Sequence, residues 1–439
     1  MGKLTKEQLE ALDKKHFLHP TSSVKQQQDY GPSIIFEKGH GIYVKDIEGK
    51  KYIEGMSSLW NVAIGYGRKE LGKAAMEQIN QLSFSSAFST FSHEPAVLLA
   101  EKLANIAPGN LNTVFFTSGG SEANDSAFKL ARYYWIMQGK PERKIIISRQ
   151  KAYHGVATGA TSATGIPEFH QVTNSLAPDF LHVETDSVEA LKKLIAQEGP
   201  ENIAAFIAEP VMGAGGMFIP ADDYLTQIRS VCSEHDILFI ADEVITGFGR
   251  TGKMFGVENW GVVPDILTFA KGITSGYFPL GGVLISEDIF QVFKEKSTGT
   301  LFHGFTYSGH PVGCHIASEN LSIIEKEKLV ENSCAMGLEL LKGFKKLEED
   351  FNYVGDSRVI GLLGGFELYA NAKSKNRFSE KMAPKVVAEA AKNGLICRSV
   401  TYNHSDTIVL APPLIINKNE INKIISILKE TIKTVIADK

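Results

Sequence analysis

Short apolar runs alternate with helical patterns from about residue 70 to residue 330, and this alternation limits the folds open to the chain. The runs are apolar on both faces, which is typical of a mostly parallel sheet covered by helices. Helical stretches such as 95–106, 187–197 and 222–235 lie between them. We therefore predict an α/β fold. The predicted strands are Thr113–Thr117, Lys144–Ser148, Ile203–Ala208, Ile237–Ala241, Ile266–Phe269 and Gly282–Ile285.

The two ends of the chain show a different pattern. Residues 34–54 predict a small meander with turns at glycines. Beyond the alternating region the pattern predicts a long helix and then mixed strands and helices, at 315–347, 358–369, 379–393, 395–400, 407–411 and 418–435. We expect the two ends, 1–60 and 331–439, to join into one smaller α+β domain beside a large α/β domain at 61–330.

Composition excludes several classes of protein. Lys and Arg number 46 against 50 Asp and Glu, and a net charge of −4 argues against a nucleic-acid partner. The four cysteines are scattered, with no spacing typical of a zinc site or a disulfide framework, so no metal is expected. The charged start and the lack of an 18-residue apolar run predict a cytoplasmic protein without a membrane span. The sequon at Asn124 is then expected to be unused.

The segment Phe116–Ala123, FTSGGSEA, combines a strand end, a Gly turn and a helix start. The helix carries an apolar stripe, and its N-terminus would aim free N–H groups at one point, which suits a phosphate. The alternative is an ordinary strand-to-helix turn with a serine cap. Glu122 and Asp125 place negative charge in the first turn and count slightly against a phosphate.

Two further strand ends carry charged residues. The run ILFIAD delivers Asp242 and Glu243 at the edge where open α/β sheets bind ligands. Such an aspartate suits a metal or a protonated ring nitrogen, and its alternative is a helix-cap or loop carboxylate. The run DILTFAKG ends in Lys271, whose amine desolvation would free for Schiff-base chemistry. Its alternative is a lysine that reaches back to solvent.

Other known signatures are absent or incomplete. Gly247–Gly252, GFGRTG, matches GxGxxG, but no helical stripe follows it, so we reject a dinucleotide site there. No GxSxG, HExxH or GxxxxGK[ST] motif occurs. An aromatic ring in Tyr153-His154-Gly155 would suit stacking on a planar group, and hydroxyls in His303–Gly313 would suit a phosphate. These residues, like Glu209-Pro210, also suit plain loops.

Taken together, these segments closely resemble the class III (ω-) aminotransferases, enzymes of fold type I that use pyridoxal 5′-phosphate. The resemblance runs over about residues 16–435 and rests on seven motifs in the family's order, namely SGGSEAND, YHG, the EP of IAEPVMGAGG, ADEVITGFGRTG, FAKGITSG, HGFTYSGHP and APPL. The fold implied is a large, mostly parallel sheet domain with a smaller α+β domain. The assembly implied is a homodimer with its active sites at the interface.

The resemblance also implies roles for single residues. Lys271 is similar to the lysine that forms a Schiff base with the cofactor and moves the proton, and Asp242 to the carboxylate that keeps the pyridine nitrogen protonated. The other residues implied to bind the cofactor are Gly120, Ser121, Tyr153, His154, Glu209 and Val244, with Thr306 donated by the partner subunit. Two half-reactions through a pyridoxamine form imply ping-pong kinetics.

The substrate class follows from the branch that the chain resembles most. The motifs SSLWNV and HGFTYSGHPVG resemble the branch that moves an amino group from a primary amine or ω-amino acid, such as β-alanine or taurine, to pyruvate. Leu59, Trp60 and Tyr153 would shape the pocket, with Phe88 entering from the partner. Arg398 is similar to the arginine that binds the keto acid's carboxylate. Its alternative is an ion pair with a surface acid, since Ser399–Ser405 is longer than the family's turn.

Four alternatives stay open at this point. From another class of enzyme, a nicotinamide oxidoreductase could be claimed from GFGRTG. Within the family, the chain could serve biotin synthesis as an adenosylmethionine-8-amino-7-oxononanoate aminotransferase, or use 2-oxoglutarate instead of pyruvate. Outside enzymes, it could bind the cofactor without catalysis, although the presence of both Asp242 and Lys271 argues against this.

Overall fold

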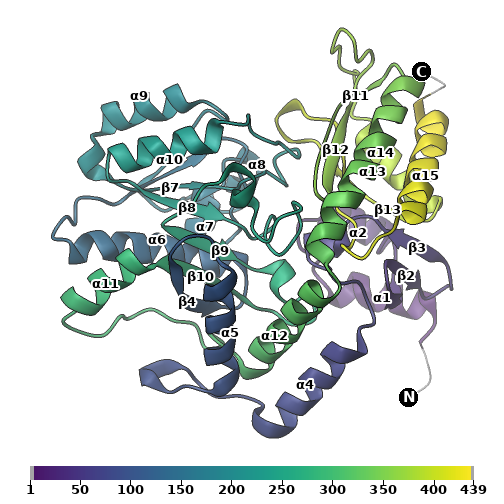
Figure 1. Ribbon diagram of the computed structural model, residues 1–439. Coiled ribbons are helices and arrows are strands. Elements are labelled where there is room, and N and C mark those ends of the chain that lie inside the picture. Colours follow the sequence, from purple (N-terminus) through teal and green to yellow (C-terminus); the bar gives the residue numbers. More distant parts are fainter. Residues whose placement is uncertain (1–3, 437–439) are drawn as a thin grey trace.

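The computed structural model describes residues 4–436, and a seven-stranded sheet fills the middle of one half of the molecule (Figure 1). Its strand order is β4-β10-β9-β8-β7-β5-β6, and only β10 runs antiparallel to its neighbours. The α/β fold with a mostly parallel sheet is thereby confirmed. The strands are Leu111–Thr117 (β4), Ile145–Arg149 (β5), Phe180–Val183 (β6), Ile203–Ala208 (β7), Leu238–Asp242 (β8), Ile266–Phe269 (β9) and Gly281–Ser286 (β10).

Helices cover both faces of this sheet. Successive strand residues point to opposite sides, so each face carries apolar side chains and has its own core. Phe206 and Phe239 belong to the core on one face, while Ile207 and Ile240 belong to the core on the other. The first core is closed by α5 (Glu94–Ile106), α9 (Val188–Glu198), α10 (Tyr224–Glu234) and α12 (Pro311–Lys326). The second is closed by α6 (Gly120–Met137) and α11 (Glu287–Lys296). All of the predicted strands and the three predicted helical stretches are thus present.

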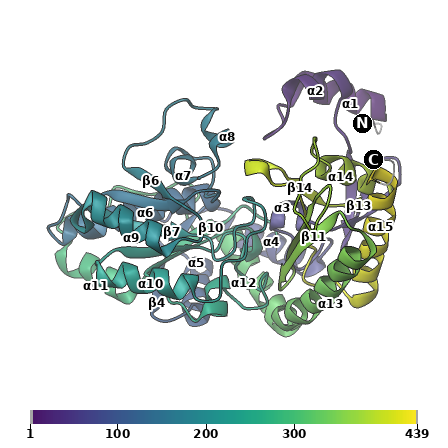
Figure 2. The ribbon, with the colours of Figure 1, turned by 90° about the horizontal axis from the view of Figure 1, so that it is seen from above.

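Elements from both ends of the chain lie side by side beyond the sheet (Figures 1 and 2). The pairing that joins them is parallel, between Ile53 of β3 and Leu395 of β13. The sheet orders are β1-β2-β3-β13 and β11-β12-β15-β14. We call residues 4–60 and 331–436 the terminal part; division into domains at residues 60 and 330 stays a prediction. The strands are Phe36–His40 (β1), Tyr43–Asp46 (β2), Lys51–Glu54 (β3), Val354–Ile360 (β11), Leu363–Leu368 (β12), Leu395–Ile396 (β13), Arg398–Val400 (β14) and Thr407–Leu410 (β15).

The sequence pattern was wrong about three local features. The expected helix 315–347 is two helices, α12 and α13 (Leu329–Asp350), separated at Lys328, whose φ is 51°. The expected run 358–369 is a hairpin of β11 and β12 with a turn at Gly361. The short strand β6 was not predicted.

The remaining helices complete the chain. In the terminal part they are α1 (Lys6–His16), α2 (Val24–Tyr30), α3 (Ser57–Trp60), α14 (Ala383–Lys392) and α15 (Lys418–Ile436). Elsewhere they are α4 (Lys69–Leu82), α7 (Thr158–Ala163) and α8 (Pro167–His170). The described residues also form five short 3₁₀ turns, four outside the terminal part at Phe88–Thr90, Pro200–Asn202, Gly256–Trp260 and Lys271–Ile273, and one within it at Tyr402–His404. Within residues 4–436, no helix is long and apolar enough to cross a membrane.

The segment Gly247–Gly252 joins the sheet to the terminal part. Arg250 is buried and donates to the carbonyls of Leu362 and Pro412, at 2.9 and 2.6 Å, and to the hydroxyl of Ser57 at 3.1 Å. Burial without a carboxylate partner lowers the pKa of Arg250 to about 9. The GFGRTG segment therefore connects the central sheet to the terminal part through the hydrogen bonds of Arg250.

Candidate active site

The carboxyl ends of the parallel strands open onto a cavity of about 600 Å³. The segments that follow β4, β5, β7, β8 and β9 meet there, as expected at this edge of an open α/β sheet. The terminal part forms the opposite wall. Eleven of the predicted site residues line the cavity: Leu59, Trp60, Gly120, Ser121, Tyr153, His154, Glu209, Asp242, Val244, Lys271 and Arg398.

Asp242, the last residue of β8, is held at the floor of the cavity by three donors. Its Oδ2 lies 2.8 Å from His154 Nδ1 and accepts from Asn124 Nδ2 at 2.8 Å, while Oδ1 accepts from the Val244 N–H at 3.1 Å. The carboxylate is only 3% exposed. A buried carboxylate that accepts several hydrogen bonds is fixed in position and favours a positive partner in the cavity.

Glu243, the neighbour of Asp242, points away from the cavity. It accepts from the N–H groups of Gly256 and Val257, both at 2.8 Å, and from the Thr246 hydroxyl. Burial raises the pKa of Glu243 to about 7, although these hydrogen bonds act to lower it. The two carboxylates that the sequence placed together thus have different surroundings, and only Asp242 faces the cavity.

Lys271 follows β9, which is the strand next to β8 in the sheet. Its φ of 47° places the residue in the left-handed region, and such backbone strain is common at functional sites. Burial lowers the pKa of Lys271 to about 8, and Arg398 also lowers it, while Asp242 and Glu209 act to raise it. The structure therefore shows a cavity-facing amine that is far more often uncharged at neutral pH than an ordinary lysine.

The N-terminus of α6 opens into the cavity at Gly120 and Ser121. A Cβ at Gly120 would lie 2.9 Å from Val244 Cγ1, so only glycine leaves room here. Gly119 provides no side-chain cap for the helix. The two acids that argued against an anion are engaged elsewhere: Glu122 accepts from Ser118 N at 2.8 Å and Asp125 from Ala160 N at 2.6 Å. The helix end can thus receive an anion.

Glu209 holds one wall of the cavity together. Its Oε1 accepts from the Tyr153 N–H at 3.0 Å and its Oε2 from the Gly213 N–H at 3.2 Å. Burial raises the pKa of Glu209. Tyr153 lines the cavity and its ring contacts that of Phe169, with centroids 5.1 Å apart. Glu209 therefore fixes the backbone that carries the Tyr153 ring.

The opposite wall is a strained turn that carries Leu59 and Trp60. Ser57, Ser58 and Trp60 all have positive φ values, between 48° and 59°. Glu54, buried at the end of β3, accepts from the N–H groups of Met56 and Ser58 at 3.0 and 2.7 Å and thereby holds the turn. Non-glycine residues persist in this region only where their surroundings enforce it.

Arg398 lies against this wall. Its guanidinium carbon is 4.7 Å from the centroid of the Trp60 ring, and Lys271 Nζ is 5.5 Å from the same ring. Burial lowers the pKa of Arg398, while Tyr402 and Tyr153 act to raise it, Tyr402 also through a hydrogen bond. Among residues 4–436 no carboxylate forms an ion pair with Arg398, so the alternative of a surface acid is not supported.

Phe88 and Thr306, the two residues expected from a partner subunit, do not line the cavity of their own chain. Both are exposed. They nevertheless belong to neighbouring segments, because a Cβ at Gly304 would lie 2.9 Å from Phe88 Cζ. Their roles stay predictions.

Several cavity residues escaped the sequence analysis. Asn124, noted only as part of a sequon, is 1% exposed and donates to both Asp242 and the His154 carbonyl, while its own oxygen accepts from Thr268. A buried amide on the inward face of α6, one turn after the glycines, is the signal that could have revealed it. Pro20, Thr21, Phe169 and Cys397 also line the cavity, but no local pattern marks them. No group of three or more potential metal ligands occurs in the described part of the chain.

Comparison with known proteins gives consistent matches over nearly the whole chain. Residues 24–432 match the family model "Aminotransferase class-III". A putrescine–pyruvate aminotransferase of Pseudomonas aeruginosa is 40% identical, covering 96% of this chain and 95% of that protein. The crystal structure of a transaminase from the marine bacterium Virgibacillus is 57% identical with a TM-score of 0.97, covering 97% and 98%. The ω-transaminase of Pseudomonas jessenii in complex with PMP is 40% identical, with a TM-score of 0.93 and coverage of 97% and 99%.

Proposed function

The chain belongs to the class-III aminotransferases, which are enzymes that depend on pyridoxal phosphate, and we propose that it transfers an amino group from a primary amine or ω-amino acid to pyruvate. One observation carries this proposal: Asp242 and Lys271 stand at the ends of adjacent strands and face one cavity. The named activities of the relatives, putrescine–pyruvate aminotransferase and ω-transaminase, support the same pair of substrates.

The residues of the cavity fit pyridoxal phosphate. The uncapped N-terminus of α6 at Gly120 suits a phosphate, and the Ser121 hydroxyl, which accepts from Val156 N at 3.0 Å, keeps its own hydrogen to donate. Asp242 suits a protonated ring nitrogen, and Val244 and Tyr153 suit the two sides of a flat ring. The cavity also has the volume usual for a cofactor site. The relative bound to PMP, the aminated form of this cofactor, is consistent with the fit.

When bound, the cofactor supplies an electron-withdrawing ring that weakens the Cα–H bond of the substrate. Asp242 keeps the ring nitrogen protonated, because a fixed negative charge favours the charged form. His154 and Asn124 hold that carboxylate in place. Lys271 would hold the cofactor and, when a substrate amine displaces it, would be the base that takes the proton from the substrate carbon and delivers it to the cofactor carbon. The two half-reactions predict ping-pong kinetics.

Binding of the cofactor by the apoenzyme is expected to follow the titration of Lys271. Only the uncharged amine can attack an aldehyde, and the pKa of Lys271 lies at about 8. The rate of binding should therefore rise about tenfold per pH unit below pH 8 and level off above it. Stopped-flow absorbance between pH 6 and 9.5 measures this rate. Asp242→Asn should move the midpoint to lower pH, because Asp242 raises the pKa of Lys271. A rate that still rises about tenfold per pH unit at pH 9.5 would show an ordinary lysine, with a pKa near 10.5.

Arg398 is proposed to bind the carboxylate of pyruvate. Its planar guanidinium is suited to paired hydrogen bonds with a carboxylate and lies inside the cavity. We expect Arg398→Ala to raise the KM for pyruvate about a hundredfold, and that for an arylalkylamine, which has no carboxylate, hardly at all. Steady-state kinetics with each substrate varied in turn measure both constants. Equal increases in the two values would mean that Arg398 is not the carboxylate-binding residue.

We further propose a homodimer in which each subunit completes the other's site. Exposed apolar side chains gather on α4, on the turn at Phe88 and on the loop before Thr306, including Met76 at 60%, Phe91 at 69% and Phe302 at 95% exposure. An exposed apolar surface of this kind marks an interface. It carries Phe88 and Thr306, the two residues expected to reach the partner's cavity. A cytoplasmic location is part of the same proposal.

A donor and acceptor panel tests the substrate assignment. β-Alanine, taurine, putrescine and an arylalkylamine are offered as donors, and pyruvate and 2-oxoglutarate as acceptors. We expect pyruvate to be preferred. A clear preference for 2-oxoglutarate, or activity only with the substrates of the biotin pathway, would overturn the assignment while leaving the family unchanged.

A further inference from the structure

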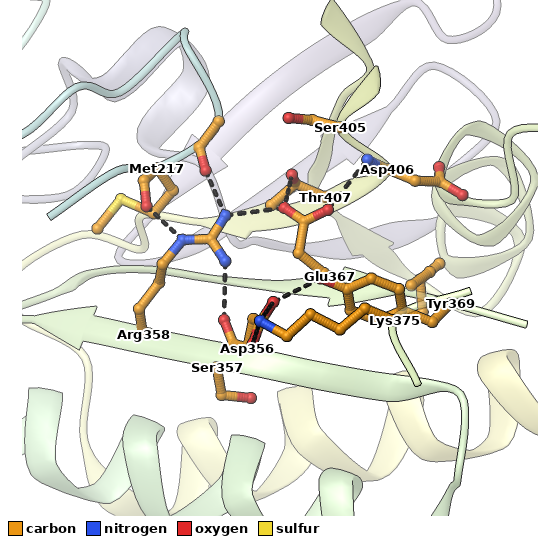
Figure 3. Close-up of polar contacts among 12 residues, drawn as sticks. Met217, Asp356, Ser357, Arg358, Glu367, Tyr369, Lys375, Ser405, Asp406 and Thr407 are labelled. Carbon is orange, nitrogen blue, oxygen red and sulfur yellow. Dashed lines mark hydrogen bonds and ion pairs between the residues drawn. The ribbon is translucent and has the colours of Figure 1, made fainter. Parts of the chain in front are cut away.

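Arg358, on β11 of the terminal part, reaches across to the loop that follows β7 of the central sheet (Figure 3). Its guanidinium donates to the carbonyls of Met217 and Gly216, and to the carbonyl of Asp356 at 2.7 Å. It also forms an ion pair with Glu367 at 2.9 Å. One side chain thus binds two successive carbonyls of the neighbouring part of the fold.

The loop that Arg358 holds belongs to the wall of the cavity. It begins at Glu209, whose carboxylate accepts from the N–H of Gly213, and Ala214 lines the cavity. Gly216 and Met217 are the far end of this loop. Arg358 therefore fixes one end and Glu209 the other.

Glu367 connects the same arginine to the strand pair that carries Arg398. Glu367 is 5% exposed, and its carboxylate accepts from the Thr407 hydroxyl and from Asp406 N at 3.2 Å, besides Arg358 (Figure 3). It also accepts from Arg377 at 2.7 Å. Burial acts to raise the pKa of Glu367, but these donors lower it below its usual value. The carboxylate is thus held in its charged form at the start of β15.

Strand β15 pairs with β14, so the position of one sets the position of the other. Thr407 is opposite Val400, and Val409 is opposite Arg398. The segment 401–406 between them carries Tyr402, which lies near enough to Arg398 to act on the pKa of its guanidinium. The long turn after Arg398 is therefore anchored at its base by Glu367.

We propose that Arg358 is a positioning residue for keto-acid binding. Through Gly216 and Met217 on one side and Glu367 on the other, it holds the Arg398–Tyr402 wall at a fixed distance from the Glu209–Met217 loop. The proposal rests on the function assigned above to Arg398.

Arg377 offers a matched control. It binds the same carboxylate as Arg358, and its other contacts are the Leu368 carbonyl at 3.4 Å and the Tyr369 ring at 4.3 Å, all within the terminal part. Arg377→Met removes a cation from Glu367 without touching the 216–217 carbonyls. Arg358→Met removes both a cation from Glu367 and the contacts with the 216–217 carbonyls. Arg358→Lys keeps the charge with fewer donors.

The test compares these variants as holoenzymes. Arg358→Met should raise the KM for pyruvate about tenfold and leave that for an arylalkylamine, which has no carboxylate, nearly unchanged. Arg358→Lys should recover part of the loss, and Arg377→Met should lower the melting temperature without separating the two KM values. Hydrogen exchange of peptides covering 213–217 and 399–406 should accelerate in Arg358→Met only.

Two results would overturn the positioning role: unchanged exchange in both segments of Arg358→Met, or KM values that rise by the same factor for both substrates. Failure of the proposed function would give a different result, because the KM for pyruvate would then be unchanged in the Arg398→Ala variant itself. If that variant leaves the KM for pyruvate unchanged while exchange in Arg358→Met accelerates, the assignment of Arg398 is wrong and the contact made by Arg358 is structural only.

Discussion

Replacing Lys271 by alanine is expected to lower the rate of transamination by about 10⁴-fold or more, because one side chain both binds the cofactor and moves the proton. Among the described residues 4–436, Lys271 is the one lysine that lines the cavity, so no second amine of this part of the chain can take over. The measurement is a single-turnover reaction with each substrate, followed by absorbance. Both half-reactions should be affected alike.

Two further variants separate this effect from loss of folding. Lys271→Arg keeps a positive charge in the cavity but cannot condense with an aldehyde at neutral pH, so it should be as inactive as Lys271→Ala. Lys253, an exposed lysine outside the cavity, serves as the control, and Lys253→Ala should retain full activity. A Lys271→Ala variant that keeps a tenth of the activity would contradict the proposed role.

Replacing Asp242 by asparagine is expected to lower kcat by about 10³-fold with little change in folding. The shape is kept, but the fixed negative charge that holds a proton on the ring nitrogen is lost. The hydrogen bonds also change. An amide nitrogen in place of Oδ2 can donate to His154 Nδ1 only if the histidine changes tautomer, and to Asn124 only if the Asn124 amide flips. The absorbance spectrum of the bound cofactor and the solvent isotope effect on kcat report the protonation directly.

Glu243→Gln is the matched control for this variant. The two carboxylates are adjacent in sequence, and only Asp242 faces the cavity. Because the pKa of Glu243 lies at about 7, a neutral glutamine resembles a form that this carboxyl already takes in part at neutral pH. We expect its spectrum to match that of the unchanged protein. Equal spectral changes in both variants would remove the special role of Asp242.

Much of the candidate site could be predicted from the sequence because its residues sit directly after strands. Gly120, Asp242 and Lys271 each follow a recognisable apolar run, and parallel strands bring such ends to one edge. What the pattern could not supply is side-chain geometry: Asn124 was missed because it binds Asp242 over 118 positions of sequence.

The misses in the fold have similar causes. No glycine or proline interrupts the sequence between α12 and α13, so the left-handed residue Lys328 could not be foreseen. Strand β6, Phe180–Val183, is as short as the predicted strand β9, but His182 interrupts its apolar run. The contact of Arg358 with the Gly216 and Met217 carbonyls joins segments far apart in the sequence, and their proximity depends on the packing of the terminal part against the sheet.

Borohydride reduction followed by peptide mapping tests the central claim most directly. The claim is that Lys271 is the residue that binds pyridoxal phosphate and carries the reaction. Reduction of the holoenzyme fixes the cofactor to the amine with which it has condensed, and the modified peptide then identifies that amine. We predict a single modified peptide containing Lys271, together with loss of activity. A modified lysine elsewhere, or an isolated protein that neither contains nor takes up the cofactor, would contradict the account.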